Sequence, residues 1–306
     1  MRQSIRGYTD AVVEQASAGG ELSATAEQLR GVQDIIAGSE DLRFVLQDPG
    51  VPVHARRGLV TDLLQGRVTD SALRLLTFVV DADRATEFIA NVAWLVARLA
   101  AGTAPGAPAG GEVVLGRSAA AERLDGYAAA VLEGLDRERT LGEIEDELFR
   151  FMRVVDGSEQ LSAALTSRTV AAESRRALVV DLLSSRATPA TVSLAAYATR
   201  VARPRDYPDL LAHLVDTVAA ESNRRLAEVR AAVALDEAQQ EQLAGALGYV
   251  AGRDVEVRVT VDPQVIGGFV ATIGDTVVDG SVRHRLELLK ERLTTPEAHS
   301  TTGEPS

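Results

Sequence analysis

Arg56-Arg57-Gly58-Leu59-Val60-Thr61-Asp62-Leu63-Leu64 returns, 119 positions later, as the nearly identical Arg175-Arg176-Ala177-Leu178-Val179-Val180-Asp181-Leu182-Leu183. At the same spacing Gly7-Tyr8 returns as Gly126-Tyr127, and Gly38-Ser39-Glu40 returns as Gly157-Ser158-Glu159. An ungapped comparison of residues 7–67 with residues 126–186 finds 21 identities in 61 positions. Chance would give roughly five in so biased a composition, so the sequence indicates a tandem duplication.

Each copy has the apolar spacing and the capping residues of a helical bundle. In the first copy, Ile5 to Ser17 predicts a helix that ends at Gly19-Gly20. Ser39 and Thr69 precede later apolar runs and are typical N-cap residues. Residues 1–100 are therefore predicted to form a bundle of about six helices, and residues 117–226 are predicted to form a second one.

Two other segments differ from the bundles in composition. Residues 101–116 contain mostly Ala, Gly and Pro without apolar periodicity, which is typical of a linker. The polar residues 294–306 are expected to be a disordered tail.

Residues 227–293 have the pattern of a small mixed domain. Val255, Val257, Val259 and Val261 alternate with polar residues, which predicts a strand, and an earlier strand is predicted around Val229 to Val233. Asp236 followed by Gln239 resembles a capping box at the start of a helix. Ile266 to Ile273, Gly274-Asp275 and Thr276 to Val278 predict a hairpin, and Ser281 can cap a last helix. The predicted fold class is therefore mainly α with a small α+β C-terminal domain, in which two tandem six-helix bundles precede a β-α-β-hairpin-α domain.

Composition limits the possible functions. The 306 residues include 32 basic and 44 acidic side chains, for a formal net charge of −12, which disfavours a nucleic acid partner. There is no cysteine, so disulfides, thiol catalysis and cysteine-based zinc sites are excluded. No apolar segment follows the N-terminus as in a signal peptide, and the apolar stretch Phe88 to Ala101 is too short to span a bilayer. Any membrane role is expected to come through partners.

Few residues suggest chemistry. The four histidines have no ligand-like spacing and no phosphate-binding glycine loop is present, so we expect neither a metal site nor a cofactor. The acidic cluster from Glu143 to Glu147 is expected to be solvated near a helix start. Asp279 with Arg283 and His284 could act as an acid or base, but a turn between a hairpin and a helix needs the same residues structurally.

Residues 265–293 closely resemble the C-terminal signature of the δ subunit of F-type ATP synthases, the family that includes the mitochondrial oligomycin sensitivity-conferring protein. The stretch contains Val265-Ile266-Gly267-Gly268-Phe269, then Ile273-Gly274-Asp275 and Asp279-Gly280-Ser281-Val282-Arg283-His284-Arg285-Leu286, before a basic, Leu-rich helix. The resemblance covers residues 120–293 as one complete family unit. Residues 5–100 are an extra bundle, as in the doubled-bundle δ polypeptides of actinobacterial type.

The resemblance implies a non-catalytic stator component. In such a component the bundle grips N-terminal helices of the α subunits on the catalytic head, and the C-terminal domain holds the membrane-anchored b stalk. Proton flow is thereby coupled to ATP synthesis at the cytoplasmic face of the cell membrane. The extra copy could hold another helix of an α subunit or brace the stalk. An adaptor that binds amphipathic helices outside the synthase is the alternative function.

The resemblance also implies candidate site residues. The first and fifth helices of each bundle would form the groove for the α subunit. The corresponding residues are Tyr8, Val12, Leu73 and Leu76 in the first copy and Tyr127, Val131, Val192 and Ala195 in the second. An apolar stripe of this kind is otherwise internal core. The C-terminal signature residues, which either bind the stalk or are structural, are Gly267, Gly268, Gly274, Asp275, Asp279, Gly280, Ser281, Arg283, Arg285 and Leu286.

Overall fold

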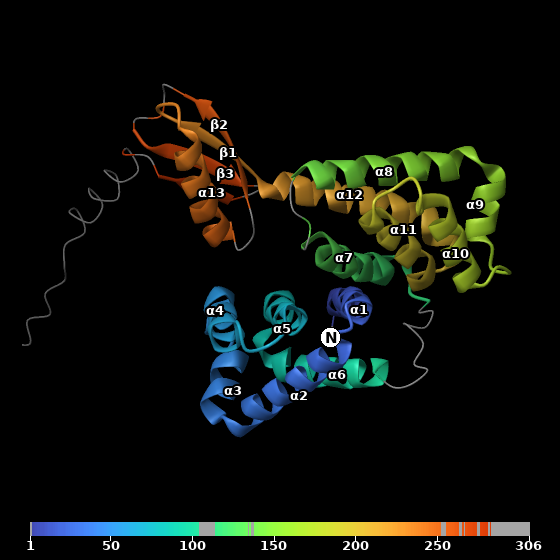
Figure 1. Ribbon diagram of the computed structural model, residues 1–306, viewed down its shortest axis with the longest axis horizontal. Coiled ribbons are helices and arrows are strands. Elements are labelled where there is room, and N and C mark those ends of the chain that lie inside the picture. Colours follow the sequence, from blue (N-terminus) through green and yellow to red (C-terminus); the bar gives the residue numbers. More distant parts are fainter. Residues whose placement is uncertain are drawn as a thin grey trace, which may run out of the picture. The chain divides into compact units, whose positions relative to one another are not determined.

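The computed structural model describes residues 2–103, 114–133, 135, 138–251, 255–262, 265, 267–273, 276–280 and 282 (Figure 1). Two compact units make up the chain, Met1–Ala219 and Ala220–Ser306. Both copies of the repeat therefore belong to the first unit. Most of the predicted linker and all of the predicted tail lie outside the described residues.

The first unit is built from helices. The first copy contains α1 (Gln3–Ala18), α2 (Leu22–Gly38), α3 (Glu40–Gln47), α4 (Val53–Leu64), α5 (Asp70–Ala82), the short 3-10 helix η1 (Ala85–Glu87) and α6 (Phe88–Gly102). The second contains α7 (Arg117–Glu133), α8 (Glu138–Gly157), α9 (Glu159–Thr166), α10 (Ala172–Leu183), α11 (Pro189–Val201), the 3-10 helix η2 (Pro204–Asp206) and α12 (Tyr207–Arg225). The last of these helices continues into the second unit.

The duplication is also a duplication of structure. The bounds of α3, α4, α5 and η1 recur 119 positions later as the bounds of α9, α10, α11 and η2. The predicted caps are present in both copies. Ser39 accepts a hydrogen bond from the Leu42 amide at 3.3 Å, and its counterpart Ser158 accepts one from Leu161 at 3.2 Å. The predicted pair of six-helix bundles is confirmed for the described residues.

The arginine at the start of the repeated nine-residue stretch, Arg56 in the first copy and Arg175 in the second, has a structural role in each copy. Arg56 and Arg175 are both buried, 4% and 2% exposed. Arg56 donates to the Val51 carbonyl at 3.3 Å, and Arg175 donates to Val170, which occupies the equivalent position. Each guanidinium therefore supplies a donor to a carbonyl of the loop before its own helix, which explains why the arginine is retained in both copies.

The buried side chains of both copies form one continuous apolar cluster, which includes Leu29, Leu75 and Leu95 from the first copy and Leu124 and Leu194 from the second. The Ala, Val and Leu side chains that dominate this sequence give the helices apolar stripes to bury, and the small Ala side chains let neighbouring helices approach closely. The two bundles thus share a single hydrophobic core and are not separate domains joined only by a linker.

The second unit is a four-stranded sheet with one helix against it (Figure 1). Its elements are β1 (Leu226–Ala231), α13 (Glu237–Ala251), β2 (Glu256–Val261), β3 (Phe269–Ile273) and β4 (Thr276–Asp279). The strand order is β2-β1-β3-β4; β1 pairs parallel to β2 through the α13 crossover, and β3 pairs antiparallel with β1 and β4. The predicted α+β domain is confirmed, and the predicted last helix lies outside the described residues.

The predicted local features of the second unit fit the structure with one difference. Asp236 and Gln239 form the capping box, since each backbone amide donates to the other side chain, at 3.0 and 2.8 Å. The first strand, however, ends at Ala231, and Val233 lies beyond it with 66% of its surface exposed. Alternation of apolar residues therefore continued past the last residue that pairs with a neighbouring strand.

The expectation for the acidic cluster was wrong at Glu147. This residue is 8% exposed, and its carboxylate accepts hydrogen bonds from the Thr188 amide at 2.9 Å and from the Thr191 hydroxyl at 2.6 Å. The helix begins at Glu138, so Glu147 is in its interior and faces the N-terminus of α11. The carboxylate thus satisfies the amide at the N-cap of another helix together with two threonine hydroxyls, which a reading of the local sequence alone could not reveal.

Candidate functional site

The two copies meet through their first helices, α1 and α7, which lie side by side (Figure 1). A glycine from each helix permits this approach. A Cβ atom on Gly7 would lie 1.8 Å from the Arg123 carbonyl oxygen, and one on Gly126 would lie 1.8 Å from the Ser4 carbonyl oxygen. Because no side chain fits at either point, the repeated glycine holds the two backbones in direct contact.

The contact is reciprocal. The Tyr8 hydroxyl donates to the Glu133 carboxylate, and the Tyr127 hydroxyl donates to the Glu14 carboxylate at 2.7 Å. Tyr127 is the repeat counterpart of Tyr8, and Glu133 is the counterpart of Glu14, each 119 positions later. The tyrosine of each copy therefore binds the equivalent glutamate of the other copy. The first helices are therefore related by an approximate two-fold arrangement.

Aromatic stacking follows the same symmetry. Tyr8 stacks on Phe78 of α5 with ring centroids 3.8 Å apart, and Tyr127 stacks on Tyr197 of α11 at 3.7 Å. In each copy the first and fifth helices thus share one aromatic pair, at the face that meets the other copy. The described rings are packed and hold the first helix of each copy on its own fifth helix.

One buried charge cluster breaks the symmetry. Asp10, 4% exposed, accepts from Arg123 at 2.7 Å, from the Tyr197 hydroxyl at 2.6 Å and from Arg98 at 3.3 Å. Burial would lower the pKa of Arg123, but Tyr197 and Asp10 beside it raise that pKa overall. Burial also raises the pKa of Tyr197, and Asp10 raises it further, so the hydroxyl remains a donor. The equivalent of Asp10 in the second copy is Ala129, so this cluster occurs once.

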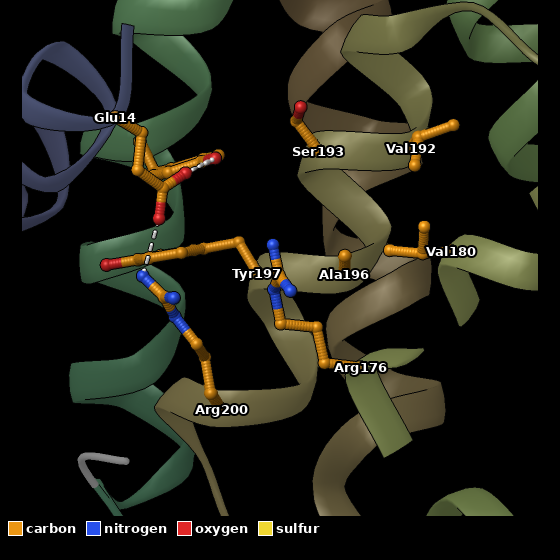
Figure 2. Close-up of a pocket in the computed structure, with 9 residues that line it drawn as sticks. Glu14, Arg176, Val180, Val192, Ser193, Ala196, Tyr197 and Arg200 are labelled. Atoms are coloured by element: carbon orange, nitrogen blue, oxygen red, sulfur yellow. Dashed lines mark hydrogen bonds and ion pairs between the residues drawn. The ribbon is translucent and has the colours of Figure 1, made fainter. Parts of the chain in front are cut away.

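A second asymmetry leaves a pocket. In the first copy, Arg74 of α5 donates to Glu133 at 3.1 Å and to the Ala130 carbonyl at 2.7 Å. Ser193 occupies the equivalent position in α11, and a pocket of about 200 Å³ lies beside it. Figure 2 shows Val180, Val192 and Ser193 along this pocket, with the Glu14–Arg200 ion pair (2.7 Å) at its edge. The pocket therefore has a mixed lining, in which Val180, Val192 and Ala196 are apolar and Glu14, Arg176 and Arg200 are charged.

The described residues contain no cluster of three or more His, Asp or Glu side chains that could hold a metal ion. Among the same residues, no helix is both long enough and apolar enough to cross a membrane.

Comparison with known proteins identifies the family. Residues 5–102 and 125–293 both match the family model described as ATP synthase delta (OSCP) subunit. The chain belongs to this family. The first matched segment is the first copy of the bundle, and the second contains the other copy together with the C-terminal unit, so the match also reflects the duplication in this δ subunit.

Curated relatives agree along most of the chain. An ATP synthase subunit delta from Salinispora arenicola is 35% identical over 277 residues, which is 89% of both chains. The corresponding protein of Kineococcus radiotolerans is 34% identical over 281 residues, 92% of this chain and 91% of its own. A chain of the Toxoplasma gondii mitochondrial ATP synthase hexamer aligns with 56% of this δ subunit at 19% identity, with a TM-score of 0.27, too low to bear on the fold.

The predicted membership of the ATP synthase δ subunit family is confirmed. The chain is a member of the ATP synthase delta (OSCP) subunit family, it associates with other subunits of the synthase, and it is a structural rather than a catalytic component. Neither the adaptor outside the synthase nor the enzyme that would use Asp279 and His284 is favoured.

Of the candidate groove residues of this δ subunit, Tyr8 and Tyr127 lie at the contact between the copies, where each hydroxyl meets a glutamate of the other copy. Tyr8, Val12, Leu76, Tyr127 and Ala195 are buried, at most 2% exposed. Leu73, Val131 and Val192 are partly exposed, and Val192 lines the pocket. Binding of the α subunit by these eight residues stays a prediction.

The described part of the C-terminal signature shows structural roles for its glycines. Gly267 and Gly268 have φ angles of 68° and 79°, in the left-handed region that favours glycine. The Gly280 amide donates to the Phe269 carbonyl at 2.9 Å, and Asp279 ends β4 with its side chain exposed. The other signature residues lie outside the described residues: Gly274, Asp275, Ser281, Arg283, Arg285 and Leu286.

Sequence reasoning missed the contact between the two copies and the Asp10 cluster that fastens it. One signal was available, since Gly7-Tyr8 and Glu14 are repeated as Gly126-Tyr127 and Glu133. A glycine allows another helix to approach closely, and a tyrosine and a glutamate on the same helix offer a donor and an acceptor to that neighbour. Their repetition in both copies is consistent with a reciprocal contact between the two helices. Asp10 carries no such signal because it has no counterpart in the second copy.

Proposed function

We propose that this δ subunit joins the catalytic head of the synthase to the C-terminal end of the b stalk. It would act at the cytoplasmic face of the cell membrane and contact the membrane only through its partners. In this way it would prevent the head from turning with the rotor, so that proton flow drives ATP synthesis. The match of both bundles and of the C-terminal unit to the family is the observation that carries this proposal.

The head side of the join is proposed to lie on the helical unit. Helical bundles bind an amphipathic partner helix by accepting its apolar residues in a groove between two helices. The candidate residues on α1, α5, α7 and α11 are apolar, and Leu73, Val131 and Val192 remain partly exposed. An N-terminal helix of the α subunit is the proposed occupant, and other subunits of the head would add contacts.

The stalk side is proposed to lie on the second unit. Its sheet has an apolar face, with Val229, Ala271 and Ile273 buried, and its other face exposes Arg230 and Arg258. The alternation follows from the two-residue period of strands, which leaves one face for the helix and one for solvent or a partner. Arg283 and Arg285 are proposed to add positive charge toward an acidic stalk helix.

A binding experiment separates the two halves of this proposal. The full chain, immobilised through a tag, is offered the cognate catalytic head and, separately, the soluble part of the cognate b subunit. Retention of both supports the join. Retention of neither would refute it and would favour the adaptor function, whereas retention of the head alone would refute the stalk assignment.

A further inference from the structure

Each copy places its first helix against the first and fifth helices of the other. Helix α1 lies along α7, and its Asp10 and Glu14 are bound by Tyr197 and Arg200 of α11. Helix α7 lies along α1, and its Glu133 is bound by Arg74 of α5. In each copy, the face formed by the first and fifth helices is therefore covered by the first helix of the other copy.

The contact is tight and specific. Tyr8 and Tyr127 are each 2% exposed, and both glycine crossings bring backbone against backbone. The hydroxyls and carboxylates at the contact pair across the copies, so the polar groups that a separated bundle would present to water are satisfied by the other bundle. The first helix of each copy is therefore packed on the other copy in the way that a partner helix binds in the groove of a helical bundle.

We propose that the first copy is the intrachain ligand of the second, and that the two copies occupy one another's grooves. A partner helix of the α subunit then engages either groove only when the α1–α7 contact opens. The inference rests on the proposed grip of the α subunit, and it assigns the duplicated copy a role that the duplication alone does not show: it competes with the external helix for the same faces.

The two grooves are not filled equally. Arg74 of the first copy reaches Glu133 and the Ala130 carbonyl, whereas Ser193 at the equivalent position leaves the pocket of about 200 Å³ beside Val192. The second groove is thus the less completely occupied, and its pocket, lined by Val180 and Val192 beside Arg176, is where an external helix first finds space.

The first test separates the copies with a side chain. In Gly126→Leu the new Cβ would lie 1.8 Å from the Ser4 carbonyl oxygen, so the α1–α7 contact has to open. Gly142→Leu is the matched control, because a Cβ on this helical glycine of α8 meets nothing within 4 Å. Calorimetric titration of the full chain with a peptide of the N-terminal helix of the cognate α subunit measures each affinity. We expect Gly126→Leu to bind at least roughly tenfold more tightly than wild type, because its binding-competent fraction rises, and Gly142→Leu to match wild type.

The second test closes the contact instead. The chain has no cysteine, so the double variant Gln3→Cys, Glu122→Cys introduces the only two thiols. The backbone N–H of Gln3 donates to the Glu122 carboxylate at 3.1 Å, so a short cleavable crosslinker can join the two helices at this point. We expect crosslinking to weaken binding of the peptide at least roughly tenfold, and reduction to restore it.

The outcomes distinguish the inference from the function on which it rests. Equal affinities of wild type, Gly126→Leu and the crosslinked chain would overturn the competition and leave the α-subunit grip in place on another surface. If even Gly126→Leu does not bind while hydrogen exchange shows α1 and α7 opened, the grip itself fails and the inference falls with it. If Gly126→Leu does not fold, the crosslinked chain decides: unchanged affinity before and after reduction overturns the competition.

Discussion

Replacing Asp10 with Asn should destabilise the helical unit more than any surface substitution. The carboxylate is 4% exposed and receives hydrogen bonds from Arg123, Arg98 and Tyr197. Asn keeps the shape but removes the negative charge, so Arg123, itself 9% exposed, is left buried without its counter-charge. Removing one partner of a buried ion pair costs about 3–5 kcal/mol.

The lower end of that range applies here, because the Arg98 side chain is 23% exposed and water can solvate part of its charge. A loss of about 3 kcal/mol in a unit of this size lowers the melting temperature by roughly 6–12 °C. Differential scanning calorimetry of the full chain measures the shift. Asp34→Asn on the exposed side of α2 is the control and should change the free energy of unfolding by less than about 0.5 kcal/mol.

A double-mutant cycle identifies the cause. Combined with Asp10→Asn, the substitution Arg123→Gln should cost less than it does alone, because the charge that it removes has already lost its partner. A loss below about 1 kcal/mol for Asp10→Asn, or strict additivity with Arg123→Gln, would refute the argument that this buried charge fastens the two copies together.

Three further substitutions test other parts of the structure. Glu147→Ala leaves the partly buried Thr188 amide and the buried Thr191 hydroxyl without their carboxylate acceptor and should cost about 1–3 kcal/mol by urea unfolding, and a loss under about 0.5 kcal/mol would contradict the account. The hydrogen bond that the His213 ring donates to the Asp125 carboxylate raises the pKa of His213 above its ordinary 6.5, although burial lowers it. The pair therefore stabilises the fold fully below pH 6.5 and loses this effect as pH rises through the folded pKa. Asp125→Asn should flatten this pH dependence in unfolding curves. Gly268→Val forces a β-branched residue to a φ of 79° and should lower the melting transition of the second unit alone, and an unchanged transition would refute the role of that glycine.

Much of the fold was predictable because its signals are local. Ser39 and Thr69 cap helices wherever they precede an apolar run, and Asp236 with Gln239 forms its box within four residues. The duplication also helped, because each copy of the repeat carries its own apolar spacing and capping residues for the corresponding helices. Local chemistry of this kind depends on neighbouring residues only, so one sequence suffices to find it.

The arrangement of the two bundles was not predictable in the same way. An apolar residue such as Val12 has the same spacing whether it faces its own core, an external helix or the other copy. The partners of Asp10 are 88, 113 and 187 positions away, so no local pattern reports them. For the same reason Glu147 was placed in solvent, although it binds the start of a helix 41 positions later.

ATP-driven proton pumping tests the central claim most directly. Membrane vesicles from cells that contain the synthase are stripped of their δ subunit, the purified full chain is added back, and acidification of the vesicle lumen is followed with a pH-sensitive dye. The account predicts that stripped vesicles hydrolyse ATP without pumping protons and that the added chain restores pumping. Stripped vesicles that still pump, or pumping that stays lost although the chain has bound, would contradict the assignment of this protein to the join between head and stalk.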